Sequence, residues 1–121
     1  MDAVKNYAEL ARQNDYFRQT VVTGEHAQVV VMTIQPGEDI GEETHEGDQI
    51  LFFVEGECEA VLDGQSGKAG PGDMVFVRAG TLHNFINTGS EPLRLVTTYA
   101  PPEHPDGTVH RTKAEAEAAE H

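Results

Sequence analysis

Three side chains that are able to bind a metal ion alternate along one short stretch of the sequence. Glu43, His45 and Gln49 are spaced by two and by four residues. Because residues two apart lie on the same face of an extended segment, all three are expected to point inward together with Leu51 and Phe53. The stretch therefore predicts one candidate ligand face.

A fourth ligand candidate, His83, begins a later stretch. Ala79 and Gly80 form a turn before it, so its imidazole is expected at the start of a strand, on the same face as Phe85. Two histidines, one carboxylate and one amide form a set of two nitrogen and two oxygen donors. Such a set suits a divalent metal ion, namely zinc, iron, manganese or nickel, and leaves positions open to water or substrate.

The spacing of these residues resembles that of the cupin superfamily, whose members are small jelly-roll barrels with two short motifs. The first cupin motif has two histidines and a glutamate between two glycines, and its positions are occupied here by Gly37, Glu43, His45, Gln49 and Gly56. The second has a Pro-x-Gly turn followed by a histidine and an asparagine, and its positions are occupied by Gly72, Arg78, Gly80, His83 and Asn87. The resemblance implies a small single-domain cupin with a metal in its barrel.

Three residues depart from the cupin pattern: Glu43 stands for the first histidine, Gln49 for the glutamate and Arg78 for the proline. Glu43 keeps a good oxygen donor, whereas Gln49 is a neutral and weaker one. With only Glu43 charged, a bound divalent ion keeps a net positive charge and favours an anionic or oxygen-rich ligand. The mixed set also resembles that of the phosphomannose isomerases, which are themselves cupins but have further regions that this chain lacks.

From about residue 16 to residue 100, short β-branched and aromatic runs alternate with glycine-containing turns. Gly56 and the pair Asp63 and Gly64 are typical of hairpins. Many short strands at regular spacing favour an all-β sandwich or barrel over a βαβ sheet. Together with the cupin resemblance, they predict one all-β jelly-roll barrel domain over residues 1–121.

A short helix is predicted at each end of the barrel. Residues 2–14 have apolar side chains at helical spacing, with Asp2 as the expected N-cap. Residues 101–121 form a polar tail that is expected to be peripheral. Thr112 and Glu115 have the spacing of a capping box before an Ala/Glu helix.

Other side chains that could react or bind a ligand have simpler structural explanations. His104 and His110 flank a turn in the tail and are expected to be solvated, unless the tail folds across the barrel mouth. Cys58 alternates with apolar residues, which favours a buried, inert thiol. Asn87 is expected to bond to the backbone at a turn.

The strand over residues 50–54, Ile-Leu-Phe-Phe-Val, is apolar on both faces. Such a strand should be covered on both sides. The sequence therefore predicts a homodimer in which a second copy covers the outer face.

Composition excludes several classes of function. The 21 acidic and 8 basic residues give a formal charge of -13, which disfavours nucleic acid and anionic membranes as partners. No apolar run is long enough to span a bilayer, and the start lacks the pattern of a signal peptide, so a cytoplasmic location is expected. The single cysteine cannot form an internal disulfide or the cysteine pairs of a zinc finger.

These features predict a metal-binding protein that acts on a small polar metabolite. The ligand set is compatible with sugar isomerisation or epimerisation at a polarised carbonyl, and with a non-haem dioxygenase. The alternative is a non-catalytic module that binds or senses a small molecule, because no general base stands apart from the expected ligands. No Ser-His-Asp order, phosphate loop or nucleotide fingerprint is present.

Overall fold

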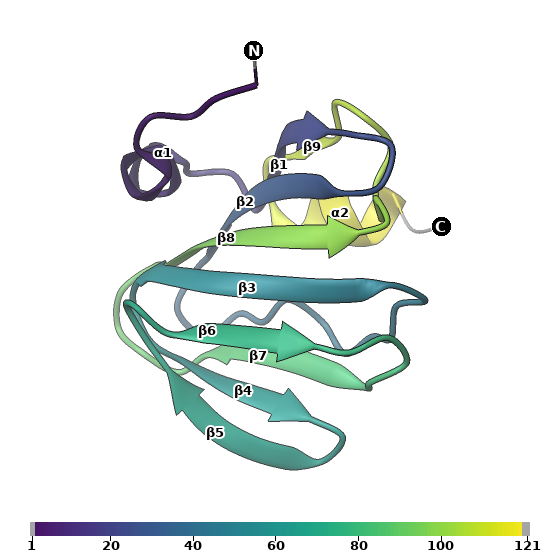
Figure 1. The fold of residues 1–121 in the computed structure, drawn as a ribbon. Coiled ribbons are helices and arrows are strands. Elements are labelled where there is room, and N and C mark those ends of the chain that lie inside the picture. Colours follow the sequence, from purple (N-terminus) through teal and green to yellow (C-terminus); the bar gives the residue numbers. More distant parts are fainter. Residues whose placement is uncertain (1, 120–121) are drawn as a thin grey trace.

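Two antiparallel β-sheets face each other in the structure, which is a computed structural model and describes residues 2–119 (Figure 1). The larger sheet has the strand order β6-β3-β8-β2-β1-β9 and the smaller sheet has the order β5-β4-β7. In chain order the elements are α1 (Tyr7–Gln13), β1 (Arg18–Thr23), β2 (Gln28–Ile34), β3 (Asp48–Glu55), β4 (Cys58–Leu62), β5 (Gln65–Ala69), β6 (Met74–Val77), β7 (His83–Asn87), β8 (Leu93–Ala100), β9 (Val109–His110) and α2 (Lys113–Ala119). The predicted all-β jelly-roll barrel with a short helix towards each end is confirmed.

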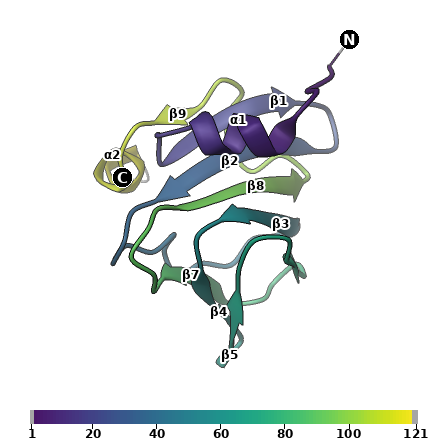
Figure 2. The same ribbon diagram turned by 90° about the vertical axis from the view of Figure 1, so that its left-hand side faces the viewer.

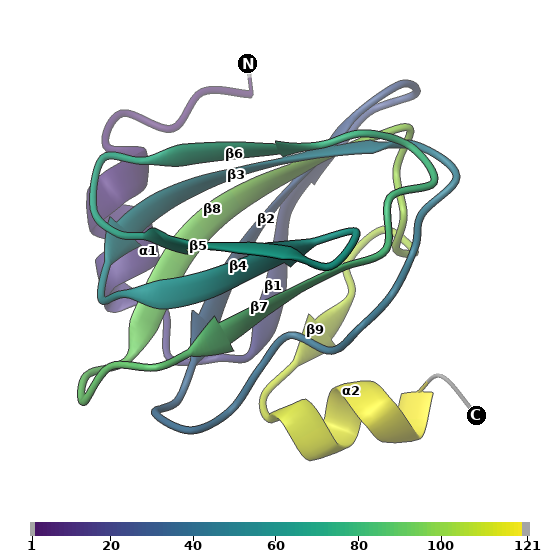
Figure 3. The ribbon, with the colours of Figure 1, turned by 90° about the horizontal axis from the view of Figure 1, so that it is seen from below.

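The space between the sheets holds the core, and strand alternation decides which side chains enter it (Figure 3). Along β3, Gln49, Leu51 and Phe53 are buried. Their inward orientation was predicted from the sequence and is confirmed. Across the two sheets, the rings of Phe53 on β3 and Phe85 on β7 lie 5.9 Å apart, so the two layers are in contact there.

Helix α1 begins later than the sequence suggested. Its N-cap is Asn6, whose side chain accepts a hydrogen bond from the Glu9 backbone at 3.0 Å, so the prediction of Asp2 as the cap was wrong. Asn6 and Glu9 have the spacing that satisfies the free amides of a first helical turn. The helix lies on the outer face of the larger sheet, where Ala11 packs with Val31 and Val96 (Figure 2).

The outer face of the larger sheet is only partly covered. Helix α1 shields Val54, but Phe52 on β3 is 37% exposed. On the neighbouring edge strand β6, Met74 and Phe76 are 55% and 42% exposed. In this single chain, the expectation that β3 is covered on both faces therefore holds only at its α1 end.

The tail after Ala100 is more closely integrated than expected. It returns to the larger sheet, where β9 pairs with the start of β1 and places His110 opposite Arg18. The buried side chain of Gln28 binds the tail backbone at His104 twice, donating to its carbonyl at 2.8 Å and accepting from its amide at 3.1 Å. We call residues 101–112 the strap, because they bind across the β1–β2 hairpin.

Helix α2 follows the strap. Thr112 caps it by accepting a hydrogen bond from the Glu115 amide at 3.1 Å, as predicted. In the part of the chain that the structure describes, neither helix is long and apolar enough to cross a membrane.

Gly47, just before β3, fits closely against the start of the strap. A Cβ at this position would lie 2.5 Å from the Ala100 carbonyl oxygen and 2.6 Å from Pro101 Cδ. We expect Gly47→Ala to lower the free energy of unfolding by about 1–3 kcal/mol, because neighbouring backbone has to move. Urea unfolding measures this change. In Gly67→Ala, the control, a Cβ meets nothing within 4 Å, so equal effects of the two substitutions would contradict the close fit.

Candidate metal centre

Backbone pairing brings the two sequence motifs together. The Glu43 amide donates to the His83 carbonyl at 3.0 Å, and the His83 amide donates back to the Glu43 carbonyl at 3.0 Å. Further along, the Ile40 amide donates to the Phe85 carbonyl at 3.0 Å. The segment before β3 thus runs antiparallel beside β7, and this bridge places Glu43 next to His83.

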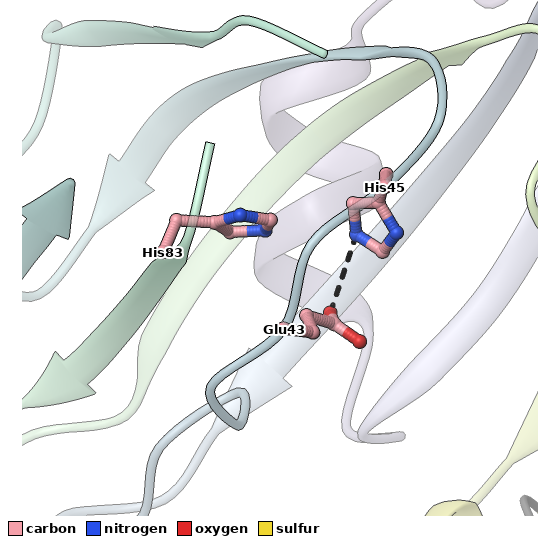
Figure 4. Close-up of side chains that lie close together, drawn as sticks. All are labelled: Glu43, His45 and His83. Atoms are coloured by element: carbon pink, nitrogen blue, oxygen red, sulfur yellow. Dashed lines mark ion pairs between the residues drawn. The ribbon is translucent and has the colours of Figure 1, made fainter. Parts of the chain in front are cut away.

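His45 completes a cluster of three. Its carbonyl accepts a hydrogen bond from the Gly80 amide at 2.9 Å, and its ring lies 5.0 Å from the ring of His83. The ligand atoms of Glu43, His45 and His83 all lie within 4.8 Å of one another (Figure 4). The predicted proximity of these three residues is confirmed.

Gln49 reaches the barrel interior by a different path from the one expected. The chain bends at residues 46–47 before β3 begins, so Glu43 and Gln49 do not share one continuous strand face. Gln49 is 1% exposed and its amide nitrogen donates to Thr97 Oγ1 at 3.0 Å. Its Oε1 is buried without a hydrogen-bond partner in the described chain, which leaves an oxygen donor available.

The tautomer of His83 is fixed by its backbone contact. Its Nδ1 lies 2.8 Å from the Thr81 carbonyl oxygen, which can only accept, so Nδ1 carries the proton. Nε2 of the neutral ring then has a free lone pair, and this atom is buried without a hydrogen-bond partner among residues 2–119. This is the arrangement that orients a metal-binding histidine.

His45 lies between two carboxylates. Its Nε2 is 3.4 Å from Glu43 Oε1, and its Nδ1 is 3.2 Å from Glu103 Oε1. Burial lowers the pKa of His45, but the two carboxylates outweigh burial and raise it overall. Burial likewise acts to raise the pKa of Glu43, yet His45, His83 and Arg18 lower it overall. Glu43 is therefore ionised at neutral pH.

The donor set of the cluster fits a divalent metal ion. Two imidazole nitrogens and one carboxylate, all held by backbone contacts, are the ligand types that zinc and first-row transition metals prefer. Nε2 of His83, which is buried without a hydrogen-bond partner in the described chain, is further support, because buried polar atoms normally have partners.

The strap histidines are not solvated, so that expectation was wrong. His104 is partly buried, with its ring in edge contact with Tyr99 at 5.2 Å, and His110 Nδ1 accepts a hydrogen bond from Arg18 at 2.9 Å. Both histidines are partly buried because the strap returns to β1 and Gln28. Burial, aided by the charge of Arg18, lowers the pKa of His104 to about 4.

Sequence reasoning missed three residues around the cluster: Arg18, Tyr99 and Glu103. Arg18 and Tyr99 lie opposite the inward-facing residues Met32 and Gln49, so strand alternation could have found them once the pairing was known. Nothing local in the sequence indicated Glu103, because its position depends on the path of the strap.

Two structural expectations hold. Asn87 donates to the backbone carbonyls of Ile34 at 2.8 Å and Glu91 at 2.9 Å. Cys58 is buried, and burial raises the pKa of its thiol to about 11, so it stays protonated at neutral pH.

Comparison with known proteins agrees with the fold. Residues 30–99 match the model of the cupin domain family, and the chain therefore belongs to the cupin family. It is 45% identical to the uncharacterized protein YrkC of Bacillus subtilis over 97% of this chain and 67% of that protein. The crystal structure of BH2720 from Bacillus halodurans superposes with a TM-score of 0.94 and 41% identity, covering 96% of this chain and 93% of that one. The HTH-type transcriptional regulator PuuR of Escherichia coli is 30% identical over 60% of this chain and 40% of its own length.

The buried His104 predicts a defined pH dependence of stability. Its folded-state pKa of about 4 lies below the unfolded value of about 6.5. The unfolded chain therefore binds more protons between these values, and this contribution to stability is complete above pH 6.5 and is lost as the pH falls towards 4.

Over this window, we expect the melting temperature of the wild type to fall further than that of His104→Gln. The extra fall should be about 4 °C or more, which is the shift that roughly 1 kcal/mol produces in a domain of this size. Thermal unfolding from pH 7.5 to pH 4 measures the difference. The carboxylates and His45 are common to both proteins, so parallel curves would contradict the burial of His104.

Proposed function

We propose that this cupin binds a divalent metal ion through Glu43, His45 and His83 and acts on a small polar metabolite at that ion. The observation that carries the proposal is the convergence of the three ligand atoms within 4.8 Å, with Nε2 of His83 buried and without a hydrogen-bond partner in the described chain. Gln49 is the proposed fourth ligand through its unpartnered Oε1. Zinc, iron, manganese and nickel all suit this set.

A bound ion would supply Lewis-acid polarisation of a carbonyl if it is redox-silent, or oxygen chemistry if it is iron. The residues of the chain have separate roles. Thr81 and Glu103 orient the two ligand imidazoles through their Nδ1 atoms. His104, whose pKa is lowered to about 4, is neutral at pH 7 and a weak proton acceptor, so its role would be to donate or accept a hydrogen bond as a neutral imidazole.

The alternative is a non-catalytic module that binds or senses a small molecule. One observation favours it: the similarity to the transcriptional regulator PuuR, which extends over 60% of this chain. In such a module the barrel holds a ligand without converting it. The two functions make different predictions for the metal-loaded protein.

Substitution of the ligands tests the metal site. We expect the wild type to bind close to one equivalent of zinc or iron, and His45→Ala or His83→Ala to weaken zinc binding by about 100-fold or more, because a missing imidazole is not replaced by an equal donor. Competition with a chromogenic chelator measures the affinities. His26→Ala is the matched control, since the side chain of His26 is 88% exposed and distant in sequence from both motifs.

The result against the proposal is equal zinc affinity in all four proteins.

Catalysis and sensing are then separated with the zinc and iron forms of the wild type. Screening small diketones, hydroxy acids and sugar phosphates for oxygen uptake and for solvent-deuterium incorporation detects dioxygenase and isomerase chemistry respectively. Saturable binding of one compound without either signal would select the sensor.

The homodimer is also a proposal, supported by an apolar strip on the outer face of the larger sheet. Phe52, Met74 and Phe76 are exposed there, and β6 forms the edge of the sheet. A strip of this kind on a sheet edge is a common surface for pairing with a second copy.

Light scattering at micromolar concentration should give about twice the chain mass of 13.2 kDa. Phe76→Glu should shift this mass towards that of one chain, because a charge would be buried in the contact. Val4→Glu serves as the control, since Val4 has a similar exposure of 48% but lies ahead of α1. A wild type that is monomeric would reject the dimer.

A further inference from the structure

Arg18 is a buried charge without a carboxylate partner. It is 3% exposed, and no acidic side chain of the described chain lies within 4.0 Å of its guanidinium. Its Nη1 donates to His110, and its Nε is buried without a hydrogen-bond partner. Because a guanidinium stays charged, burying it unpaired is costly.

The other arginines of the described chain are either ion-paired or exposed. Arg94, which is also largely buried, forms ion pairs with Glu55 at 2.9 Å and Asp15 at 3.2 Å. Arg12 pairs with Glu9 on the surface of α1, and Arg78 and Arg111 are exposed. Among the described residues, Arg18 is therefore the one arginine that is buried and has no carboxylate within 4.0 Å.

Two more hydrogen-bonding groups near Arg18 lack good partners. The hydroxyl of Tyr99, a residue only 1% exposed, and Nε2 of His104 are both buried without a hydrogen bond of good geometry within residues 2–119. Their rings are in edge contact, and the His45 ring lies against Tyr99 at 5.6 Å. The charge of Arg18 acts on both groups. Unsatisfied groups thus gather beside the metal cluster.

Space is available next to Arg18. Arg18 and Glu43 line the same cavity, whose volume is about 110 Å³. This is the share of roughly four liquid water molecules, enough for a carboxylate and little more. The cavity joins an unpaired cation to a proposed metal ligand.

We propose that Arg18, assisted by Tyr99 and His104, binds the carboxylate of a small hydroxy acid or oxo acid whose neighbouring oxygen reaches the metal centre. The inference rests on the proposed function and names its substrate class. The planar fork of an arginine matches the two oxygens of a carboxylate.

Charge and volume favour a carboxylate over a phosphate. The charged side chains that line the cavity are the cations Arg18 and Lys113 and the carboxylates Glu42, Glu43 and Glu117, and Arg18 offers one positive charge without a carboxylate partner, which suits a monoanion. Lys113, the other cation that lines the cavity, is already paired with Asp39. A phosphate dianion would find no second free cation among these residues.

The test compares lactate with lactamide, which has the same shape and the same hydroxyl but no charge. Isothermal titration of the zinc-loaded wild type should give lactate an affinity at least about tenfold higher than that of lactamide. In Arg18→Gln the two affinities should agree within about threefold, with that of lactamide unchanged. Arg12→Gln, which removes a surface guanidinium, should keep the full preference.

If Arg18 only holds the strap in place, lactate and lactamide should bind the wild type with equal affinity, and that result overturns the inference. If Arg18→Gln does not fold, Arg18→Met replaces it, because methionine keeps an apolar stem but has no charge; this variant should also lose the preference, and a full preference in it rejects the inference. If the protein takes up no zinc, the metal proposal fails separately. The titration of metal-free protein then decides: lactate binding that requires Arg18 supports the carboxylate site, and its absence overturns it.

Discussion

The site depends on the register of β8 with its two neighbours in the larger sheet. Side chains alternate along each strand, so residues in one pairing row face the same side. A slip by one residue would turn every inward side chain outward. The inner rows, from the site end inward, are Gln28–Tyr99–Gln49, Val30–Thr97–Leu51 and Met32–Leu95–Phe53. The hydrogen-bonded ladder that builds the apolar core therefore also places a polar row at one end of it.

That polar end departs from the usual rule that buried polar groups have partners. Among the described residues, those with buried side-chain atoms lacking hydrogen-bond partners are Arg18, His45, Gln49, His83, Arg94, Tyr99 and His104. All except Arg94, which is ion-paired, belong to the metal cluster or surround it. Local rules are broken at functional sites more than elsewhere, and the aliphatic rows behind the cluster offset the cost. The concentration of these groups at one end is the main physical support for the ligand site proposed there.

The sequence predicted what depends on local pattern. Alternation predicted the inward side chains of β3, and Asp63 and Gly64 predicted the β4–β5 hairpin. The hairpin expected at Gly56 was wrong, because β3 and β4 belong to different sheets and the turn leads from one to the other. The approach of Glu43 to His83 was implied by the resemblance to the cupin motifs. The sequence could not predict the bend at residues 46–47 or the return of the strap, because both depend on contacts between distant residues. Gly47 can bend there only because it lacks the Cβ that would meet Ala100.

The strap also separates two tasks within the site. The proposed metal ligands come from the two motifs and are held by the backbone pairing of Glu43 with His83. The groups around them, Glu103 and His104, come from the strap, which is fixed by Gln28 and by β9 against Arg18. Orientation of His45 by Glu103 thus requires that the strap is docked. Because the proposed ligands lie on the motifs whereas Arg18 and the groups around them lie on β1 and the strap, changes in these two segments could alter the choice of ligand without altering the proposed metal site.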